Sequence, residues 1–370
     1  MTATVPAMAN AHSHAFQIGL RGIGERPASS SDDFWSWRTE MYRLASSHDP
    51  DSMRTVGERA YGEMASAGYG SVGEFHYLHH QPDGSPYAEP NAMAIALADA
   101  ADAAGLEIAL LPAAYHRAGW DGRDRPPTEG QRRFCDADPD AFLARVASLT
   151  DWARERPRVA VGVAVHSVRA VPASWIEAIG GYAERHDLVR HVHACEQRRE
   201  LEECAAEHGC TPIELLDRCG FLGARTSVVH GIHVSPGDIA LLADRGCTVI
   251  SCPTTEGNLG DGYLPALRYR AAGVPLAIGS DSQVRIDPFE EARELETGAR
   301  REGQTRFGLL AGTGDLWGTL AASGRASLGL DGPAPTIEID LEHPDLEGVD
   351  EHDLNLALAT CASAAVVAPA

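Results

Sequence analysis

The chain is an alternation of two kinds of segment. Short, almost continuously apolar runs are separated by amphipathic stretches in which apolar residues recur every three or four positions. Apolar strands that alternate with helices are typical of a parallel sheet. Eight such units favour a (β/α)8 TIM barrel, an α/β fold, over an open sheet. The apolar runs cover residues 7–11, 69–75, 106–114, 159–165, 189–194, 226–229, 247–251 and 274–278, and the amphipathic stretches include residues 53–67, 91–104, 139–154, 173–185, 236–245 and 288–301.

Polar residues capable of chemistry follow nearly every apolar run. In a (β/α)8 barrel the active site lies at the carboxyl ends of the strands, on the loops that lead into the helices. Random placement would not put reactive side chains after so many strands, so the sequence predicts an enzyme with its site at this end. These residues are His12 and His14, residues 74–80, Tyr115 and His116, residues 166–169, His193 and Glu196, His230, residues 254–261, and Ser280 and Asp281.

The charged residues exclude several classes of function. The formal net charge is −22, whereas nucleic acids and anionic membranes bind clustered cations. We therefore expect neither a nucleic-acid nor a membrane partner. The chain contains no lysine, so all 31 cationic residues are arginine. A Schiff-base lysine, a P-loop lysine and a carbamylated lysine that bridges two metals are all excluded.

The cysteines and the N-terminus predict a cytoplasmic protein. The eight cysteines form no CxxC pair and no spacing typical of a disulfide framework. Residues 1–10 have no cationic segment followed by a long apolar run, so we expect no signal peptide. No apolar run is long enough to span a bilayer.

Four residues at strand ends form a candidate metal site. His12 and His14 are two positions apart on a predicted strand, so both imidazoles face the same side. His193 ends the fifth predicted strand and Asp281 follows the eighth. Three imidazoles and one carboxylate suit a divalent metal with an open coordination position, as in catalytic zinc sites. We therefore predict one divalent metal per chain and favour Zn²⁺.

Two further strand-end residues are candidate catalytic groups. His230 ends the sixth predicted strand, where it could hydrogen-bond to the substrate or to water. Glu196 lies three residues after a predicted ligand and could transfer protons. His191 is expected to pack one layer deeper in the barrel, and Cys195 is expected to be structural.

Several motifs together resemble the amidohydrolase superfamily in its mononuclear form. HSH follows the first predicted strand, HxHxxEQ the fifth, VHG the sixth and GSDS the eighth. The absence of lysine agrees, because binuclear members bridge their metals with a carbamylated lysine. Over about residues 6–330 the chain is similar to the formimidoylglutamate deiminases of this superfamily. The motifs that carry this resemblance are HSHAFQ at 12–17, FWSWR at 34–38, EFHYLHH at 74–80, HSVR at 166–169, PTTEGNLGDG at 253–262 and GSDSQV at 279–284.

The resemblance implies a reaction and a set of catalytic roles. The reaction is the metal-dependent hydrolytic deamination of N-formimino-L-glutamate to N-formyl-L-glutamate and ammonia, in histidine degradation. Asp281, at once ligand and base, would take a proton from water. His230 would stabilise the developing tetrahedral centre, and Glu196 would transfer a proton to the leaving nitrogen.

The resemblance also implies substrate contacts. Arg38 and Arg169 would each hold a carboxylate with a planar, permanently charged guanidinium. Gln17, Tyr77 and His166 would be further polar contacts. The expected partners are this small dicarboxylate substrate and a second copy of the chain in a homodimer.

Three departures from the family pattern concern the chain ends and one loop. Family members carry an N-terminal segment that forms a small β-sandwich with the C-terminus, whereas we expect this chain to begin at the first barrel strand. We expect residues 1–330 to form the barrel and residues 331–370, which are acidic and rich in alanine, to be a remnant of the subsidiary domain or poorly ordered. Gln283 stands where the pattern has histidine.

Two alternative functions stay open. One is another deaminase activity of the same superfamily, on a nucleobase or on a different acyclic amidine. A planar base needs a stacking pocket and no pair of arginines, so Arg38 and Arg169 argue against it. The other is a catalytically inactive barrel that binds a ligand, against which the complete set of ligands and Glu196 argue.

Overall fold

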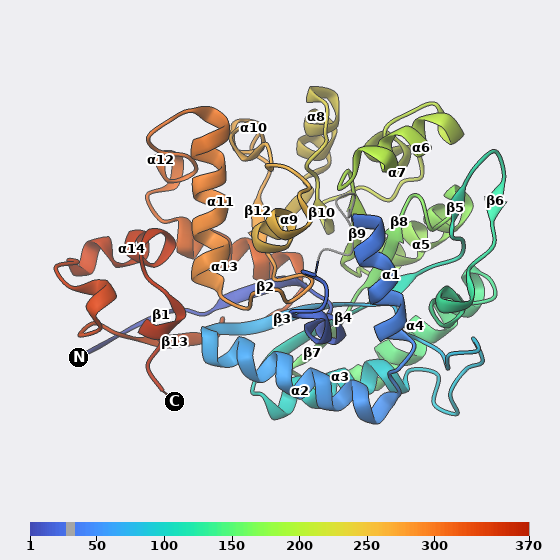
Figure 1. The fold of residues 1–370 in the computed structure, drawn as a ribbon, viewed down its shortest axis with the longest axis horizontal. Helices are drawn as coiled ribbons and strands as arrows, with labels where there is room; N and C mark the ends of the chain where they lie inside the picture. The colour runs from blue at the N-terminus through green and yellow to red at the C-terminus, as the bar shows by residue number, and fades with distance from the viewer. Residues whose placement is uncertain (27–33, 370) are drawn as a thin grey trace.

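The computed structural model describes residues 1–26 and 34–369, and a barrel of parallel strands surrounded by helices lies at its centre (Figure 1). The hydrogen-bonded order of the strands is β12-β11-β10-β9-β8-β4-β3-β2, and all neighbours in this order are parallel. The predicted (β/α)8 barrel is confirmed. Its strands are β2 (Met8–Ser13), β3 (Tyr69–His76), β4 (Glu107–Ala114), β7 (Val159–Val161), β8 (Val163–Ser167), β9 (Arg190–Ala194), β10 (Thr226–His230), β11 (Thr248–Ser251) and β12 (Leu276–Ile278).

The fourth apolar run, residues 159–165, forms two short strands rather than one. Both β7 and β8 pair with β4, and Gly162 separates them. A Cβ atom at Gly162 would lie 2.6 Å from the Val189 side chain and 2.8 Å from that of Leu111. The close approach of neighbouring strands therefore requires glycine at this break.

The barrel closes between β12 and β2, through residues that include predicted metal ligands. Ser13 and Asp281 form a parallel bridge. The Asp281 N–H donates to the His12 carbonyl at 3.0 Å, and the His14 N–H donates to the Asp281 carbonyl at 3.0 Å. The backbone hydrogen bonds that close the barrel therefore also set the relative positions of these three side chains.

Replacing Gly279 with alanine is expected to destabilise this closure. A Cβ at Gly279 would lie 2.7–2.8 Å from backbone atoms and the Cβ of His12, and such overpacking typically costs about 1–3 kcal/mol. The free energy of unfolding, measured by urea titration, should fall by that amount. Gly62→Ala is the matched control, because a Cβ at Gly62 in helix α2 (Pro50–Ala67) meets nothing within 4 Å and alanine favours a helix. Equal stability of the two variants would contradict the predicted crowding at the closure.

Several outer helices begin with the same sequence signal. A polar N-cap residue followed by proline at the first helical position starts α2, α4, α7, α8 and α11. The helices are α1 (Phe34–Ala45), α2 (Pro50–Ala67), α3 (Ala92–Ala103), α4 (Pro139–Ala153), α5 (Ala173–Arg185), α6 (Arg198–His208), α7 (Pro212–Arg218), α8 (Pro236–Arg245), α9 (Pro253–Leu259), α10 (Ala266–Ala271), α11 (Pro288–Gly303), α12 (Leu310–Thr313), α13 (Leu316–Ser327) and α14 (Leu354–Thr360).

The two ends of the chain meet beside the barrel. β1 (Thr2–Pro6) pairs antiparallel with β13 (Thr336–Asp340), and both termini lie near this ribbon (Figure 1). The expectation that the chain begins at the first barrel strand is therefore wrong. Only Val5 of β1 is buried, so this strand lacks the apolar run by which barrel strands were recognised. After β13, α14 packs against α11 and α13. The division at residue 330 stays a prediction.

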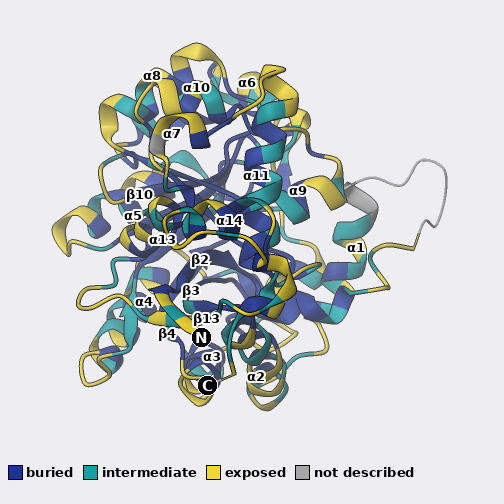
Figure 2. Ribbon diagram, turned by 90° about the vertical axis from the view of Figure 1, so that its left-hand side faces the viewer, coloured by how far each residue is buried: buried dark blue, intermediate teal, exposed yellow. Residues whose placement is uncertain are grey.

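The barrel strands are less exposed to solvent than the elements that surround them. The barrel strands are mostly buried, and the exposed residues lie on outer helices, on loops and on the ribbon of β1 and β13 (Figure 2). A short ribbon of β5 (Gly119–Trp120) and β6 (Asp124–Arg125) extends from the loop that follows β4. None of the described helices has the length and apolar character needed to cross a membrane.

Candidate metal-dependent active site

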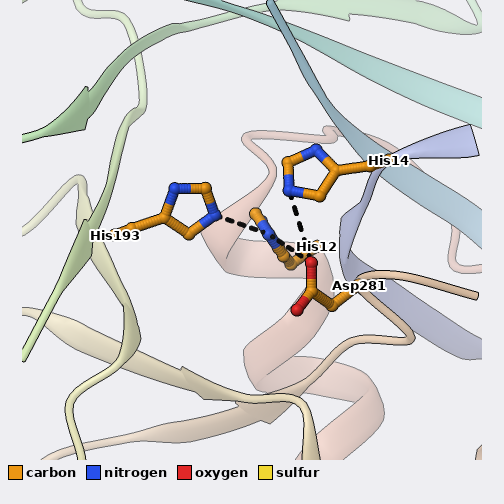
Figure 3. Close-up of side chains that lie close together, drawn as sticks. All are labelled: His12, His14, His193 and Asp281. Atoms are coloured by element: carbon orange, nitrogen blue, oxygen red, sulfur yellow. Dashed lines mark hydrogen bonds and ion pairs between the residues drawn. The ribbon is translucent and has the colours of Figure 1, made fainter. Parts of the chain in front are cut away.

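The predicted metal ligands converge at the carboxyl ends of three strands (Figure 3). His12 and His14 come from the end of β2, His193 from β9, and Asp281 from the turn after β12. Their ligand atoms all lie within 4.8 Å of one another, and all four residues are buried. Asp281 Oδ1 is 3.4 Å from His12 Nε2 and 3.3 Å from His14 Nε2, and His12 Nε2 is 3.0 Å from His193 Nε2.

Hydrogen bonds behind two of the imidazoles direct their free nitrogens into the cluster. His14 Nδ1 is 2.8 Å from the Phe75 carbonyl, and His193 Nδ1 is 2.9 Å from the His166 carbonyl. A carbonyl only accepts, so each ring carries its proton on Nδ1 and has a lone pair on Nε2. Burial lowers the pKa of His12 to about 3, and that of His14 is also lowered. Neutral imidazoles facing one carboxylate fit a divalent cation such as zinc.

The ligands are supported by a second layer of hydrogen bonds. Ser13, between the two β2 ligands, donates to Glu74 at 2.7 Å and accepts from the Gln283 amide at 2.9 Å. Gln283 also donates to the Asp281 carbonyl at 2.9 Å and accepts from the Ser280 hydroxyl at 2.8 Å. Gln283 therefore stabilises the turn that carries Asp281 at the position where the family pattern has histidine.

The two candidate catalytic residues, His230 and Glu196, face the same cluster. His230 Nε2 lies 3.8 Å from Glu196 Oε1 and 3.9 Å from Asp281 Oδ2. Burial lowers the pKa of His230, but Glu196, Asp281 and Glu256 outweigh this and raise it to about 10. Burial raises the pKa of Glu196. At neutral pH His230 is therefore a cation that can donate from Nε2, while Glu196 holds its proton more firmly than an exposed glutamate does.

The backbone at these strand ends is unusual. His230, Asp281, Cys195 and Gln283 all have positive φ angles, between 46° and 71°. Non-glycine residues rarely adopt this conformation, and they do so mainly where the surrounding structure enforces it at functional sites. At these positions the strands turn sharply, and the side chains of His230 and Asp281 are directed toward the cluster.

One cavity connects the metal cluster to the predicted substrate contacts. His12 lies beneath it, fully buried against His193 and Asp281. Of the other expected residues, His191 packs in the barrel, where its Nε2 is 2.9 Å from the Ser327 carbonyl, and Cys195 is buried. The predicted residues that line the cavity are His14, Gln17, Arg38, Tyr77, His166, Arg169, His193, Glu196, His230 and Asp281.

The lining of the cavity includes a pair of arginines. Arg38, on α1, and Arg169, after β8, both line it, and burial together with Arg169 lowers the pKa of Arg38. Arg169 donates to the Ala118 carbonyl at 3.1 Å and forms no ion pair with a carboxylate of the described residues. Of the FWSWR motif, side chains are described only from Trp37 onward. Two neighbouring guanidinium groups facing one cavity are suited to bind an anionic ligand.

A polar acceptor lies near the cluster. Gln17 donates from Nε2 to the Tyr77 hydroxyl at 2.8 Å. Its Oε1 is buried and, among the described residues, has no hydrogen-bond partner. Since buried polar atoms are normally paired, this oxygen is available to accept from an N–H group of a ligand in the cavity.

The amidohydrolase family model matches residues 3–309. The chain belongs to the amidohydrolase family. It is 38% identical over 304 residues to a formimidoylglutamate deiminase from Pseudomonas aeruginosa, an alignment that covers 82% of this chain and 66% of the relative, or just under two thirds of the relative's length.

Two solved structures show that the whole chain has the fold of this family. An amidohydrolase from Brucella melitensis superposes with a TM-score of 0.89 at 35% identity, over 98% of this chain and 84% of that one. An adenosine deaminase from Xanthomonas campestris with bound zinc gives a TM-score of 0.81 at 23% identity, over 99% of this chain and 78% of that one. At that lower identity the likeness concerns the fold alone.

The amidohydrolase site contains residues that the sequence analysis did not assign. Glu256 lies behind His230, with its Oε1 3.3 Å from His230 Nδ1. Glu256 belongs to the PTTEGNLGDG motif, so the motif pointed to this part of the site although it did not indicate the contact with His230. Near the arginine pair, Gln131 donates to the hydroxyls of Tyr115 at 2.7 Å and Tyr42 at 3.0 Å. No sequence spacing indicated the hydrogen bond between Gln131 and Tyr42, because it joins α1 to a segment that is distant in the chain.

A second group of potential ligands adjoins the metal cluster of this amidohydrolase. His230, Cys252 and Asp281 offer ligand atoms within 4.8 Å of one another. This group offers one imidazole, whereas the cluster of His12, His14, His193 and Asp281 offers three, so the cluster is better suited to a divalent cation.

Proposed function

We propose that this amidohydrolase catalyses the hydrolytic deamination of N-formimino-L-glutamate to N-formyl-L-glutamate and ammonia, a reaction of histidine degradation. One observation carries the proposal: a single cavity is lined both by members of the metal-ligand cluster and by two guanidinium groups. The proposed substrate has a group for each, a hydrolysable formimino carbon and two carboxylates. The relative from Pseudomonas aeruginosa, named for this activity, supports the same substrate.

The two ends of the substrate are matched by different residues. Arg38 and Arg169 bind the two carboxylates, for which a planar guanidinium offers two parallel hydrogen bonds. The unpartnered Gln17 Oε1 accepts from an N–H group of the formimino end. Tyr77 and His166 border the space between them, since both line the cavity.

His12, His14, His193 and Asp281 would hold one divalent cation, which we propose to be zinc. Three neutral imidazoles and a carboxylate are a donor set that zinc prefers in catalytic sites. When bound, the ion supplies the Lewis acidity that allows water to act as a nucleophile at neutral pH.

The proton transfers fall to residues of the chain. Asp281 takes a proton from the attacking water as the water oxygen bonds to the formimino carbon. His230 donates a hydrogen bond from Nε2 and stabilises the charge that develops on that oxygen. Glu196 gives a proton to the formimino nitrogen during this addition and takes the remaining hydroxyl proton when the tetrahedral centre collapses. Asp281 passes the proton that it took from water to the same nitrogen, the carbon–nitrogen bond breaks, and ammonia leaves with the formyl product.

The direct test is the release of ammonia from N-formimino-L-glutamate. Adenosine, cytosine and guanine form the comparison panel, because the adenosine deaminase from Xanthomonas campestris shares the fold. We expect turnover of N-formimino-L-glutamate and of none of the three comparison compounds. Turnover of a comparison compound alone would show that the proposed substrate is wrong. No turnover of any compound by the metal-loaded protein would favour the inactive-barrel alternative.

Elemental analysis of the purified protein should find one divalent metal per chain, because among the described residues a single group offers four buried ligands, and no lysine can bridge two ions. Chelation should abolish activity, and refilling with zinc should restore it. Two tightly bound metals per chain would contradict this expectation and would indicate a second metal site at His230, Cys252 and Asp281. Activity that survives metal removal would contradict a metal-dependent mechanism.

A further inference from the structure

Glu256 is a buried carboxylate in which both oxygens accept hydrogen bonds. It lies on α9, the short helix after β11, and only 3% of its surface is exposed. Oε1 accepts from the Cys252 N–H at 2.7 Å, and Oε2 accepts from the Ser251 hydroxyl at 2.8 Å. Oε1 also faces His230 Nδ1 at 3.3 Å. The two donors from the end of β11 fix the carboxylate, so it presents Oε1 to the imidazole in one orientation.

We propose that Glu256 is a positioning residue: it holds the His230 ring with a protonated Nδ1 facing its carboxylate, so that Nε2 faces the reacting atoms. Both oxygens of the Glu256 carboxylate act as hydrogen-bond acceptors, so the His230 nitrogen that faces Oε1 must be the donor. Nε2 is then directed to the other side of the ring, where Glu196 Oε1 and Asp281 Oδ2 lie 3.8 and 3.9 Å away.

The surroundings of His230 show why such a partner is needed. The residue lies in the left-handed backbone region, with φ of 71°, and glycine follows it. Its ring stacks on that of His193, with centroids 5.6 Å apart and planes 16° apart. Stacking sets the plane of the imidazole but does not distinguish the ring from one flipped by half a turn about the Cβ–Cγ bond. The hydrogen bond to Glu256 makes this distinction, as carboxylates behind functional histidines commonly do.

The kinetic test compares two buried glutamates near the same loop. Glu256→Gln should lower kcat by about 10- to 100-fold, the usual effect of removing such a partner, with KM within about twofold and an unchanged metal content. Glu291→Gln is the control, because Glu291 is also fully buried and accepts from the N–H and hydroxyl of Thr254, at 3.0 and 2.5 Å. It should keep kcat. Equal losses in both variants, or a loss confined to KM, would overturn the positioning role.

A spectroscopic test separates this inference from the proposed function, on which the catalytic part of it rests. In protein with ¹⁵N-labelled histidine and bound zinc, we expect the His230 ring to carry a proton on Nδ1, and the Nδ1–H signal to shift or broaden in Glu256→Gln. His230→Gln identifies the signal by its loss. If Glu256→Gln does not fold, Ser251→Ala, which frees only Oε2, should give a smaller shift of the same signal. An unprotonated Nδ1 in the unaltered protein would overturn the inference, whatever substrate is turned over.

Discussion

Glu196→Gln is expected to lower kcat for N-formimino-L-glutamate by about 100-fold or more while metal and substrate binding persist. Glutamine keeps the size of the side chain but cannot give a proton to the departing nitrogen, and removing a general acid typically costs a factor of this order. Glu196 is not one of the four clustered ligands, and its Oε1 lies 3.8 Å from His230 Nε2. Its position therefore suits proton transfer rather than coordination.

Metal content and KM determine how that loss is interpreted. Zinc measured by elemental analysis and KM measured for the same preparation should match the unaltered protein. Loss of zinc in Glu196→Gln would make Glu196 a ligand. Unchanged kcat would end its assignment as the proton donor.

Arg169→Met should raise KM strongly and reduce kcat/KM by about a few hundredfold or more. A buried carboxylate that loses its charged partner costs about 3–5 kcal/mol, and each 1.36 kcal/mol corresponds to about a factor of ten. The Arg169 guanidinium lines the cavity, and its donor to the Ala118 carbonyl fixes its position without neutralising its charge. Its charge is therefore available for a carboxylate of the substrate.

An analogue of N-formimino-L-glutamate that lacks one carboxylate supplies the contrast for this prediction. Arg38→Met should behave like Arg169→Met if each arginine binds one carboxylate, and the double variant should lose more than either. The unaltered protein should prefer the dicarboxylate. If the unaltered protein has the same kcat/KM for both compounds, or if Arg169→Met lowers kcat/KM equally for both, Arg169 has a structural role. The proposal of a dicarboxylate substrate would then be wrong.

Most of the fold was predictable from the sequence because barrel strands are buried on both sides. Their apolar runs therefore stand out, and each of the eight runs corresponds to a barrel strand or, for residues 159–165, to two. The ribbon of β1 and β13 was missed for the opposite reason. Only two of its ten residues are buried, and only pairing between the two chain ends makes the segments into strands.

The sequence by itself determined which residues stand at the carboxyl ends of the strands. The order of elements in a (β/α)8 barrel brings these ends together, so His12, His193 and Asp281 could be placed in one cluster although they are far apart in the chain. Only the tertiary structure decided which groups support them. Glu256 reaches His230 because a turn of α9 returns its side chain to β10, and Gln131 reaches Tyr42 across loops. Such contacts depend on how individual loops fold back over the barrel, for which strand and helix periodicity provide no signal.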